Sequence, residues 1–398
     1  MEVSDIRIVE SPSGEDRVRL CATVSYERGS PSVEDYWFDV SRPYVVDLSE
    51  TGNPWLACML PAATALGERL RVGRPVDEPL AVNAERLLRI WRTWYPELSG
   101  VTLDLDVART TGPAQPGRGG AFFSGGVDSL FTVLRDRRTA PPAERRPIDD
   151  LITVLGFDIP LEKKDAFERL RERHAGVAGR LGLQLIDVAS NLRETRWSEA
   201  QWSYLAHGAG LAAVALSLEK RFTSVCIAGG GGYRGLHPWG SHSVTDPLFS
   251  TWRTDIVYDG VAWLRTEKIE AIAQSRIALD ALHVCYETCT DENCGACNKC
   301  LRTMVALDVC GVLDECTLFP RRVDLVEAIA RMDCSHFADQ RELEDIRRLA
   351  LERGRPDVVR AIDRSMRLTR WRQRVRDGRR RLSGPVRALA SRFGKGGE

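Results

Sequence analysis

Short apolar runs alternate with helical patterns across the middle of the chain, and this alternation constrains the fold more than any other feature. Four runs occur, at residues 121–123, 151–157, 184–188 and 224–228. A continuous apolar run is typical of a strand buried on both faces of a sheet. Apolar residues at helical spacing lie between the runs, notably over 163–181 and 197–218. Repeated strand–helix units favour an α/β fold with a parallel sheet, whose ligands bind at the carboxyl ends of the strands.

The sequences on either side of this region differ from it in character, and 398 residues suffice for two or three units. We predict an N-terminal α+β domain, the α/β domain, a cysteine-rich segment flanked by helices, and a helical extension with a basic tail. Their predicted limits are residues 1–108, 119–268, 269–320 and 321–398. In the first domain we expect strands at 18–26 and 36–40 and helices at 63–70 and 82–94. Glycine and proline predict a linker over 109–120.

The composition is typical of a globular chain, with 43% hydrophobic and 28% charged residues. Basic and acidic residues both number 56, so the net charge indicates no class of partner. The sequence has no run of 18 apolar residues and no secretory signal, which predicts no transmembrane segment and a cytoplasmic location. In a reducing compartment, eleven cysteines favour metal binding or catalysis over disulfides.

A glycine-rich loop, Ser124-Gly-Gly-Val-Asp-Ser129, joins the first strand of the α/β domain to its helix. Gly125 and Gly126 let the backbone turn sharply and approach an anion. The following helix would direct free amides and its positive dipole end at that anion, and the two serine hydroxyls add donors. The alternative is a simple helix cap at Ser124 or Asp128. The whole string, including Val127, favours phosphate binding.

This string resembles the pyrophosphate loop of the PP-loop ATP pyrophosphatase superfamily. The resemblance implies an adenine-nucleotide α-hydrolase-like (HUP-type) fold: a parallel five-stranded Rossmann-like sheet with helices on both faces. It also implies cleavage of ATP to AMP and pyrophosphate, with Asp128 helping to hold Mg²⁺. The string Gly156-Phe-Asp158 matches the place where the family sets backbone against adenine, which points to Phe157 and Asp158. The loop is not a Walker loop, because the Gly-Lys-Ser/Thr ending is absent.

Six of the eleven cysteines lie between Cys285 and Cys310, and this clustering indicates a metal site. Two overlapping Cys-x-x-Cys units and an upstream thiol can form a tetrahedral thiolate site, with Gly295 supplying the tight turn. Five cysteines compete for four places, and we expect Cys289 to be the spare. The predicted ligands are Cys285, Cys294, Cys297 and Cys300. A redox role and buried unliganded thiols are the alternatives.

The spacing Cys-x8-Cys-Gly-x-Cys-x2-Cys-Leu-Arg closely resembles the zinc motif of the 7-cyano-7-deazaguanine synthase branch of the same superfamily. The resemblance covers residues 121–312. It implies a structural Zn²⁺ that holds the helix after Cys300 against the ATP-binding domain. Four thiolates also suit a [4Fe–4S] cluster.

The loop from Gly229 to Pro247 carries polar residues on irregular backbone, where function concentrates. The synthase family has a shorter Arg-Asn-type sequence here, so the resemblance does not identify the substrate. Similar loops occur in ExsB-like bacterial proteins. We predict that Asp246 and His242 line the pocket and that Lys268 offsets phosphate charge. His207 lies on a small-residue helix face and is expected to be a packed core residue.

These features, with the resemblance to the PP-loop superfamily, predict an ATP-dependent, AMP-forming ligase with ATP, Mg²⁺ and Zn²⁺ as cofactors and Asp128, Lys268 and Asp246 as catalytic residues. The enzyme would adenylate a carboxylate or carbonyl oxygen of a small molecule for attack by a nitrogen or sulfur nucleophile. From Arg367 to Lys395 there are eleven basic residues and one acid, so nucleic acid or another anionic partner could bind the tail. A base-modifying enzyme of the tRNA thiolation type and an ATP-binding regulatory or defence module are the alternatives. The sequence is compatible with a homodimer.

Overall fold

The computed structural model of the chain describes residues 1–14, 16–108, 117–135, 145–320 and 323–393, with the backbone alone from residue 377. The chain divides into two compact units, Met1–Glu292 and Asn293–Glu398. Most of the linker predicted over 109–120 falls outside the described residues. Among the residues that are described, no helix is both long enough and apolar enough to cross a membrane.

The first unit is built on one sheet of ten strands in the order β10-β9-β6-β7-β8-β3-β2-β1-β4-β5. In chain order the strands are Glu2–Glu10, Arg17–Ser25, Val33–Ser41, Leu70–Asp77, Leu103–Ala108, Arg118–Phe122, Asp150–Leu155, Gln184–Ser190, Phe222–Ala228 and Asp255–Asp259. The five strands from β10 to β8 pair in parallel, as expected of the α/β region. The prediction that the sheet has only five strands is wrong.

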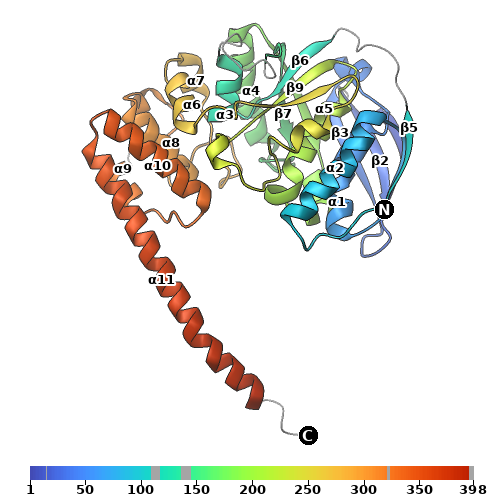
Figure 1. Ribbon diagram of the computed structural model, residues 1–398. Helices are drawn as coiled ribbons and strands as arrows, with labels where there is room; N and C mark the ends of the chain where they lie inside the picture. Colours follow the sequence, from blue (N-terminus) through green and yellow to red (C-terminus); the bar gives the residue numbers. More distant parts are fainter. Residues whose placement is uncertain (15, 109–116, 136–144, 321–322, 394–398) are drawn as a thin grey trace. The chain divides into compact units, whose positions relative to one another are not determined.

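The sheet is larger than predicted because strand β3 pairs with β8 in the antiparallel direction, placing Phe38 opposite Ser190 and Val40 opposite Val188. Without β3, strand β8 would be an edge with unpaired backbone groups, which proteins usually cover. Strands β2, β1, β4 and β5 then extend the sheet from β3 (Figure 1). The N-terminal region therefore continues the parallel sheet.

Helices cover both faces of the parallel strands, as predicted. Residues of strand β7 enter different hydrophobic clusters, because successive side chains of a strand point to opposite faces. On β7, Ile152 lies in the main core, and Leu155 packs in a separate cluster with Phe167 of helix α4. The helices of this unit are α1 Asn53–Leu66, α2 Glu78–Trp94, α3 Val127–Leu134, α4 Lys164–Leu181, α5 His207–Ser217, α6 Arg265–Ile272 and α7 Arg276–Ala281.

Two predicted helices differ from those observed. The helix expected at 63–70 is the end of α1, which stops at Leu66 because Gly67 takes a left-handed conformation with φ of 64°. The helix expected over 197–218 is interrupted. A short 3₁₀ turn and a π-helical turn, Trp202–Ala206, precede α5, and Gln201 between them has a φ of 48°. The helix expected at 82–94 lies within α2.

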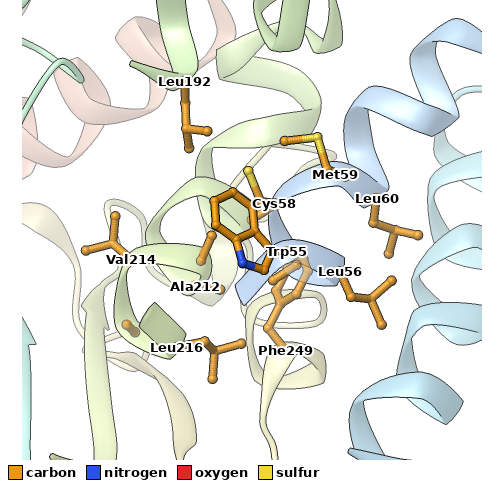
Figure 2. Close-up of a cluster of buried hydrophobic side chains, with 14 of the residues drawn as sticks. Trp55, Leu56, Cys58, Met59, Leu60, Leu192, Ala212, Val214, Leu216 and Phe249 are labelled. Carbon is orange, nitrogen blue, oxygen red and sulfur yellow. The ribbon is translucent and has the colours of Figure 1, made fainter. Parts of the chain in front are cut away.

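Trp55 lies at the centre of the main core, which joins the N-terminal helices to the parallel strands. It is fully buried on α1 and is surrounded in Figure 2 by Leu192, Val214, Leu216 and Phe249. Every residue of α1 from Asn53 to Thr64 is buried, as expected of a helix that is apolar on all sides. The core therefore links the N-terminal region firmly to the α/β region.

Replacement of Trp55 by alanine should lower the free energy of unfolding by about 3–5 kcal/mol, because it leaves a large cavity in this core. Trp55→Phe should cost much less. It keeps most of the volume and removes a buried Nε1–H that has no hydrogen-bond partner among the described residues. Chemical denaturation of both variants measures the difference. Equal decreases in the free energy of unfolding of the two variants would contradict the central position of the Trp55 side chain in the core.

The second unit is helical, with α8 Asn298–Val309, α9 Leu325–Arg331, α10 Phe337–Glu352 and α11 Pro356–Phe393. Helix α8 is held to α10 by buried polar contacts: Arg302 pairs with Asp339 at 2.8 Å, and Asn298 donates to the same carboxylate at 2.7 Å. Helix α11 (Figure 1) is 38 residues long and includes the predicted basic tail as far as Phe393, and the rest of the tail lies outside the described residues.

Candidate active site and metal centre

Two glycine-rich loops meet at the point where the strand order of the parallel sheet reverses. The chain passes from β6 to β7 and β8 in one direction, and then returns to place β9 on the other side of β6. In open α/β sheets, ligands bind outside the carboxyl ends of the strands at such a switch point. The loop Ser124–Ser129 follows β6, and the loop that begins at Gly229 follows β9. The topology therefore places both predicted loops at the expected ligand position.

The loop after β6 turns sharply at Gly125 and leads directly into helix α3. Gly125 has a φ of 72°, which favours glycine, and Gly126 is the N-cap residue of α3. Gly126 has no side chain with which to cap the helix, and the structure shows no side-chain hydrogen bond at this cap. The hydroxyls of Ser124 and Ser129 lie 3.4 Å apart beside this turn. Val127 is fully buried and anchors the start of the helix.

A cluster of three charged side chains lies at the same end of α3. Asp128 pairs with Lys268 at 3.0 Å and also with Arg265. Lys268 is only 1% exposed, and its ammonium group also donates to the carbonyl oxygen of Gly229 at the start of the second loop. The structure therefore brings together two predicted catalytic residues, Asp128 and Lys268, that lie 140 positions apart.

Arg265 is a site residue that the sequence analysis missed. It begins helix α6 three positions before Lys268, a spacing that places two side chains on the same face of a helix. This spacing from Lys268 was the sequence feature that could have identified Arg265 as a site residue. The cluster holds two cations and one anion beside the positive end of α3, so it favours a negatively charged ligand.

His174 of α4 lies behind the loop. Its Nδ1 is 3.2 Å from Thr153 Oγ1, and its Nε2 would lie 3.0 Å from a Cβ atom added to Gly125. Burial, followed by the charges of His283 and Arg173, lowers the pKa of His174 to about 3. The ring is therefore neutral at pH 7 and fills the space that glycine leaves.

Asp246 lies in a separate hydrogen-bond network. Its carboxylate is fully buried and accepts from Ser241 Oγ at 2.6 Å and from the His242 amide at 2.9 Å. A Cβ atom on Gly208, at the start of α5, would lie 2.3 Å from Asp246 Oδ1, so the loop packs tightly on that helix. His242 is also buried, and its ring lies 4.9 Å from that of Trp94. The two residues hold this loop against α5 and α2.

The side chain of Tyr258, on β10, is influenced by both the Asp246 network and the charged cluster around Asp128. Its ring would overlap a Cβ atom placed on Gly229, at 2.4 Å. Burial raises the pKa of Tyr258, and the negative charges of Asp246 and Asp128 raise it further. Carboxylates of both networks therefore act electrostatically on the hydroxyl group of Tyr258.

Asp246→Asn should change how stability depends on pH. Burial raises the pKa of Asp246 from 3.8 to about 7. The folded chain therefore holds this proton more tightly than the unfolded chain, and the contribution to stability falls as pH rises from about 4 to about 7. Asparagine removes this titration. The melting temperature of the variant minus that of the wild type should rise over that range. A difference that stays constant would contradict the buried carboxyl.

The predicted adenine-contacting residues lie at the carboxyl end of β7. Phe157 is buried with its ring 4.9 Å from that of Trp202, and Asp158 is exposed. His207 is partly exposed and lies 4.7 Å from the same indole, so its predicted burial in the core is only partial. Arg193 stacks on Trp202 and donates to the Phe157 carbonyl oxygen. This aromatic group, which the sequence analysis missed, adjoins the π-helical turn before α5.

The four predicted metal ligands come together. One sulfur atom from each of Cys285, Cys294, Cys297 and Cys300 lies within 4.8 Å of the others. Four thiolates around zinc at ~2.3 Å would have their sulfur atoms about 3.8 Å apart, and the Cys294 and Cys300 sulfur atoms are 3.8 Å apart. Among the described residues, Cys289 does not belong to this group. The cluster could therefore bind a metal ion such as zinc.

Backbone amides support the thiolates of this cluster. The Cys297 amide donates to Cys294 Sγ at 3.2 Å, and the Cys300 amide donates to Cys297 Sγ at 3.4 Å. Gly295 makes the turn between them with a φ of 66°. Such hydrogen bonds favour the charged form of sulfur, which is the form that binds metals. The donor set fits a structural site with all four positions filled by protein.

Comparison of the chain with protein-family models, curated proteins and solved structures found no match. The function of the protein is therefore inferred from the geometry and chemistry of these two sites.

Proposed function

We propose that the protein is an ATP-dependent, AMP-forming ligase whose loop Ser124–Ser129 binds the terminal phosphates of ATP. The observation that carries this proposal is the buried Lys268 paired with Asp128 at the N-terminus of α3. A buried ammonium group is costly unless it has a task or a partner. Here it lies beside helix amides and a second cation, Arg265, at the switch point of an α/β sheet. This combination of donors suits a polyphosphate better than any other common ligand.

The charge balance suggests how ATP would enter the site. Without nucleotide, Asp128 pairs with both Lys268 and Arg265 and offsets one of their two positive charges. A pyrophosphate group would compete for both cations, and their exchange would release the carboxylate. Asp128 is then the residue that would hold Mg²⁺, whose chemical contribution is to neutralise phosphate charge. The hydroxyls of Ser124 and Ser129 would donate to phosphate oxygens.

The reaction we propose has two displacements. A carboxylate or carbonyl oxygen of a small molecule attacks the α-phosphorus of ATP, the bond to the bridging oxygen breaks, and pyrophosphate leaves. A nitrogen or sulfur nucleophile then attacks the activated carbon, its proton is lost, and AMP leaves. Lys268 and Arg265 would stabilise the charge that develops on the leaving pyrophosphate, so the protein acts by positioning and electrostatics. The loop carrying Asp246 and the aromatic group around Trp202 flank the site and are proposed to contact the acceptor and adenine.

The basic C-terminal helix favours a second candidate, in which the acceptor is a base of a nucleic acid. Arg370, Arg372, Arg374 and Arg376 of α11 are part of the basic tail, and Trp371 is exposed. Arginine side chains suit a phosphate backbone, and an exposed indole can stack on a base. If a nucleic acid is the acceptor, removal of the residues after 366 should abolish tRNA binding. If a small molecule is the acceptor, the same truncation should leave AMP formation unchanged.

The test of the main proposal is acceptor-dependent AMP formation. The protein is incubated with ATP, Mg²⁺, ammonium and pools of carboxylate-bearing metabolites, and AMP is measured by mass spectrometry. At least one pool should yield AMP and pyrophosphate in equal amounts with the wild type and none with Lys268→Met. Lys164→Met, which alters an exposed lysine at the start of α4, is the matched control. Formation of ADP in place of AMP would refute the proposal.

A further inference from the structure

The segment that leads into the metal site also forms the wall of the glycine loop. We define residues 281–285, which run from the end of α7 to the first metal ligand, as the strap. The His283 amide donates to the Gly125 carbonyl oxygen at 2.9 Å. A Cβ atom on Gly125 would lie 3.1 Å from the Ala281 carbonyl oxygen, and one on Gly126 would lie 3.6 Å from that of His283. The strap therefore contacts the loop at both glycines.

The strap itself is fixed in place by burial. Leu282 is fully buried, and Val284 and Cys285 are nearly so. Cys285 ends the strap and contributes one of the four clustered sulfur atoms. The Cys285 thiol is thus only two positions along the chain from the His283 amide. Because the backbone between them is tightly packed, neither group can move far without the other.

A second connection runs through helix α4. Asp291, in the metal-binding loop after Cys285, is buried and pairs with Arg169 at 2.9 Å and with Arg173 at 3.1 Å. Lys163, just before α4, donates to the Thr288 carbonyl oxygen at 3.0 Å. The next residue after Arg173 is His174, whose ring packs against Gly125. The same helix therefore anchors the metal-binding loop and supports the glycine loop.

We propose that the strap couples the two sites, so that metal bound at the four cysteines holds the glycine loop in its anion-binding conformation. The bound metal fixes Cys285, the strap keeps the His283 amide on the Gly125 carbonyl, and the positive-φ turn is retained. Loss of the metal loosens the turn. The inference concerns the loop to which the proposed function assigns the phosphates, but the coupling exists without nucleotide.

The first test is hydrogen exchange of the full chain, with zinc bound and after chelation under reducing conditions, without ATP. Amides of residues 122–130 should exchange about tenfold faster or more without metal. Peptides of β2 and β3, within 17–41, should not change and serve as an internal control. Cys285→Ser should reproduce the metal-free pattern, and Cys289→Ser, outside the sulfur cluster, should not. Faster exchange confined to residues 285–300 would overturn the proposal.

The second test uses the reciprocity of coupled sites: if bound metal stabilises the loop, a disturbed loop must weaken metal binding. Gly125→Ala strains a φ of 72° and crowds His174. It should release zinc to a chromophoric chelator several times faster than the wild type. Gly176→Ala on α4 is the matched control, since a Cβ atom there meets nothing within 4 Å. If chelation unfolds the whole chain, hydrogen exchange cannot test the coupling and the zinc release rate tests it instead. Equal release rates in Gly125→Ala and Gly176→Ala would then refute the coupling. A protein that shows the coupling yet binds no ATP would refute the proposed function alone.

Discussion

Cys297→Ser is expected to lose its bound metal and, with it, much of the resistance of the second unit to thermal unfolding. The serine hydroxyl is a poor replacement for a thiolate, and the amide of Cys300 loses the sulfur to which it donates at 3.4 Å. Structural zinc contributes about 10–16 kcal/mol of apparent binding free energy in small zinc domains. Only part of that binding free energy supports folding in a larger unit with its own core. A fall of about 10 °C or more in the melting temperature is expected.

The matched control for this prediction is Cys289→Ser. Cys289 lies in the same loop, but it does not belong to the sulfur cluster. Zinc content, measured by elemental analysis, and melting temperature should therefore stay at the wild-type values. A Cys297→Ser protein that remained stable and fully loaded with zinc would show that other residues are the ligands.

Asp128→Asn is expected to decrease AMP formation by about a thousandfold while the chain stays folded. The substitution removes the carboxylate that we assign to Mg²⁺. It also leaves Lys268 and Arg265 without the anion with which both pair in the unliganded chain. The variant should therefore bind free ATP, without Mg²⁺, more tightly than the wild type does, although it turns over far more slowly. A titration with and without Mg²⁺ separates these two effects.

Asp165→Asn is the control for this variant, because Asp165 also lies in the first turn of a helix, α4, but is exposed. Its turnover and ATP affinity should match those of the wild type. Unchanged turnover of Asp128→Asn would exclude the role assigned to this carboxylate. Weaker binding of metal-free ATP would contradict the proposed competition between carboxylate and phosphate.

The parts of this molecule that could be predicted from the sequence depend on local patterns. The cysteine spacing places three sulfur atoms within one turn and the start of α8, so the ligand set, with Cys289 as the spare, followed from the spacing of the thiols. The loop Ser124–Ser129 was equally local, because its glycines and the next helix are consecutive. The parallel strands β6 to β9 were evident from continuous apolar runs.

The remaining features depend on contacts between distant segments, which a single sequence does not reveal. The pairing of β3 with β8 joins residues about 150 positions apart and turns the expected five-stranded sheet into one of ten strands. The burial of Asp246 depends on Gly208, whose missing side chain leaves room for the carboxylate. Arg265 resembles any surface arginine until α6 brings it to Asp128. Gln201, with its positive φ, interrupts a helix that the spacing of apolar residues had predicted to be continuous.

The most direct measurement is a crystal structure of the protein grown with ATP and Mg²⁺. We expect the terminal phosphates to accept hydrogen bonds from amides between Gly125 and Ser129, with Lys268 and Arg265 turned from Asp128 to the phosphate oxygens. Nucleotide bound at any other place, or an unoccupied loop at a saturating concentration of ATP, would contradict the assignment of this loop as the phosphate site.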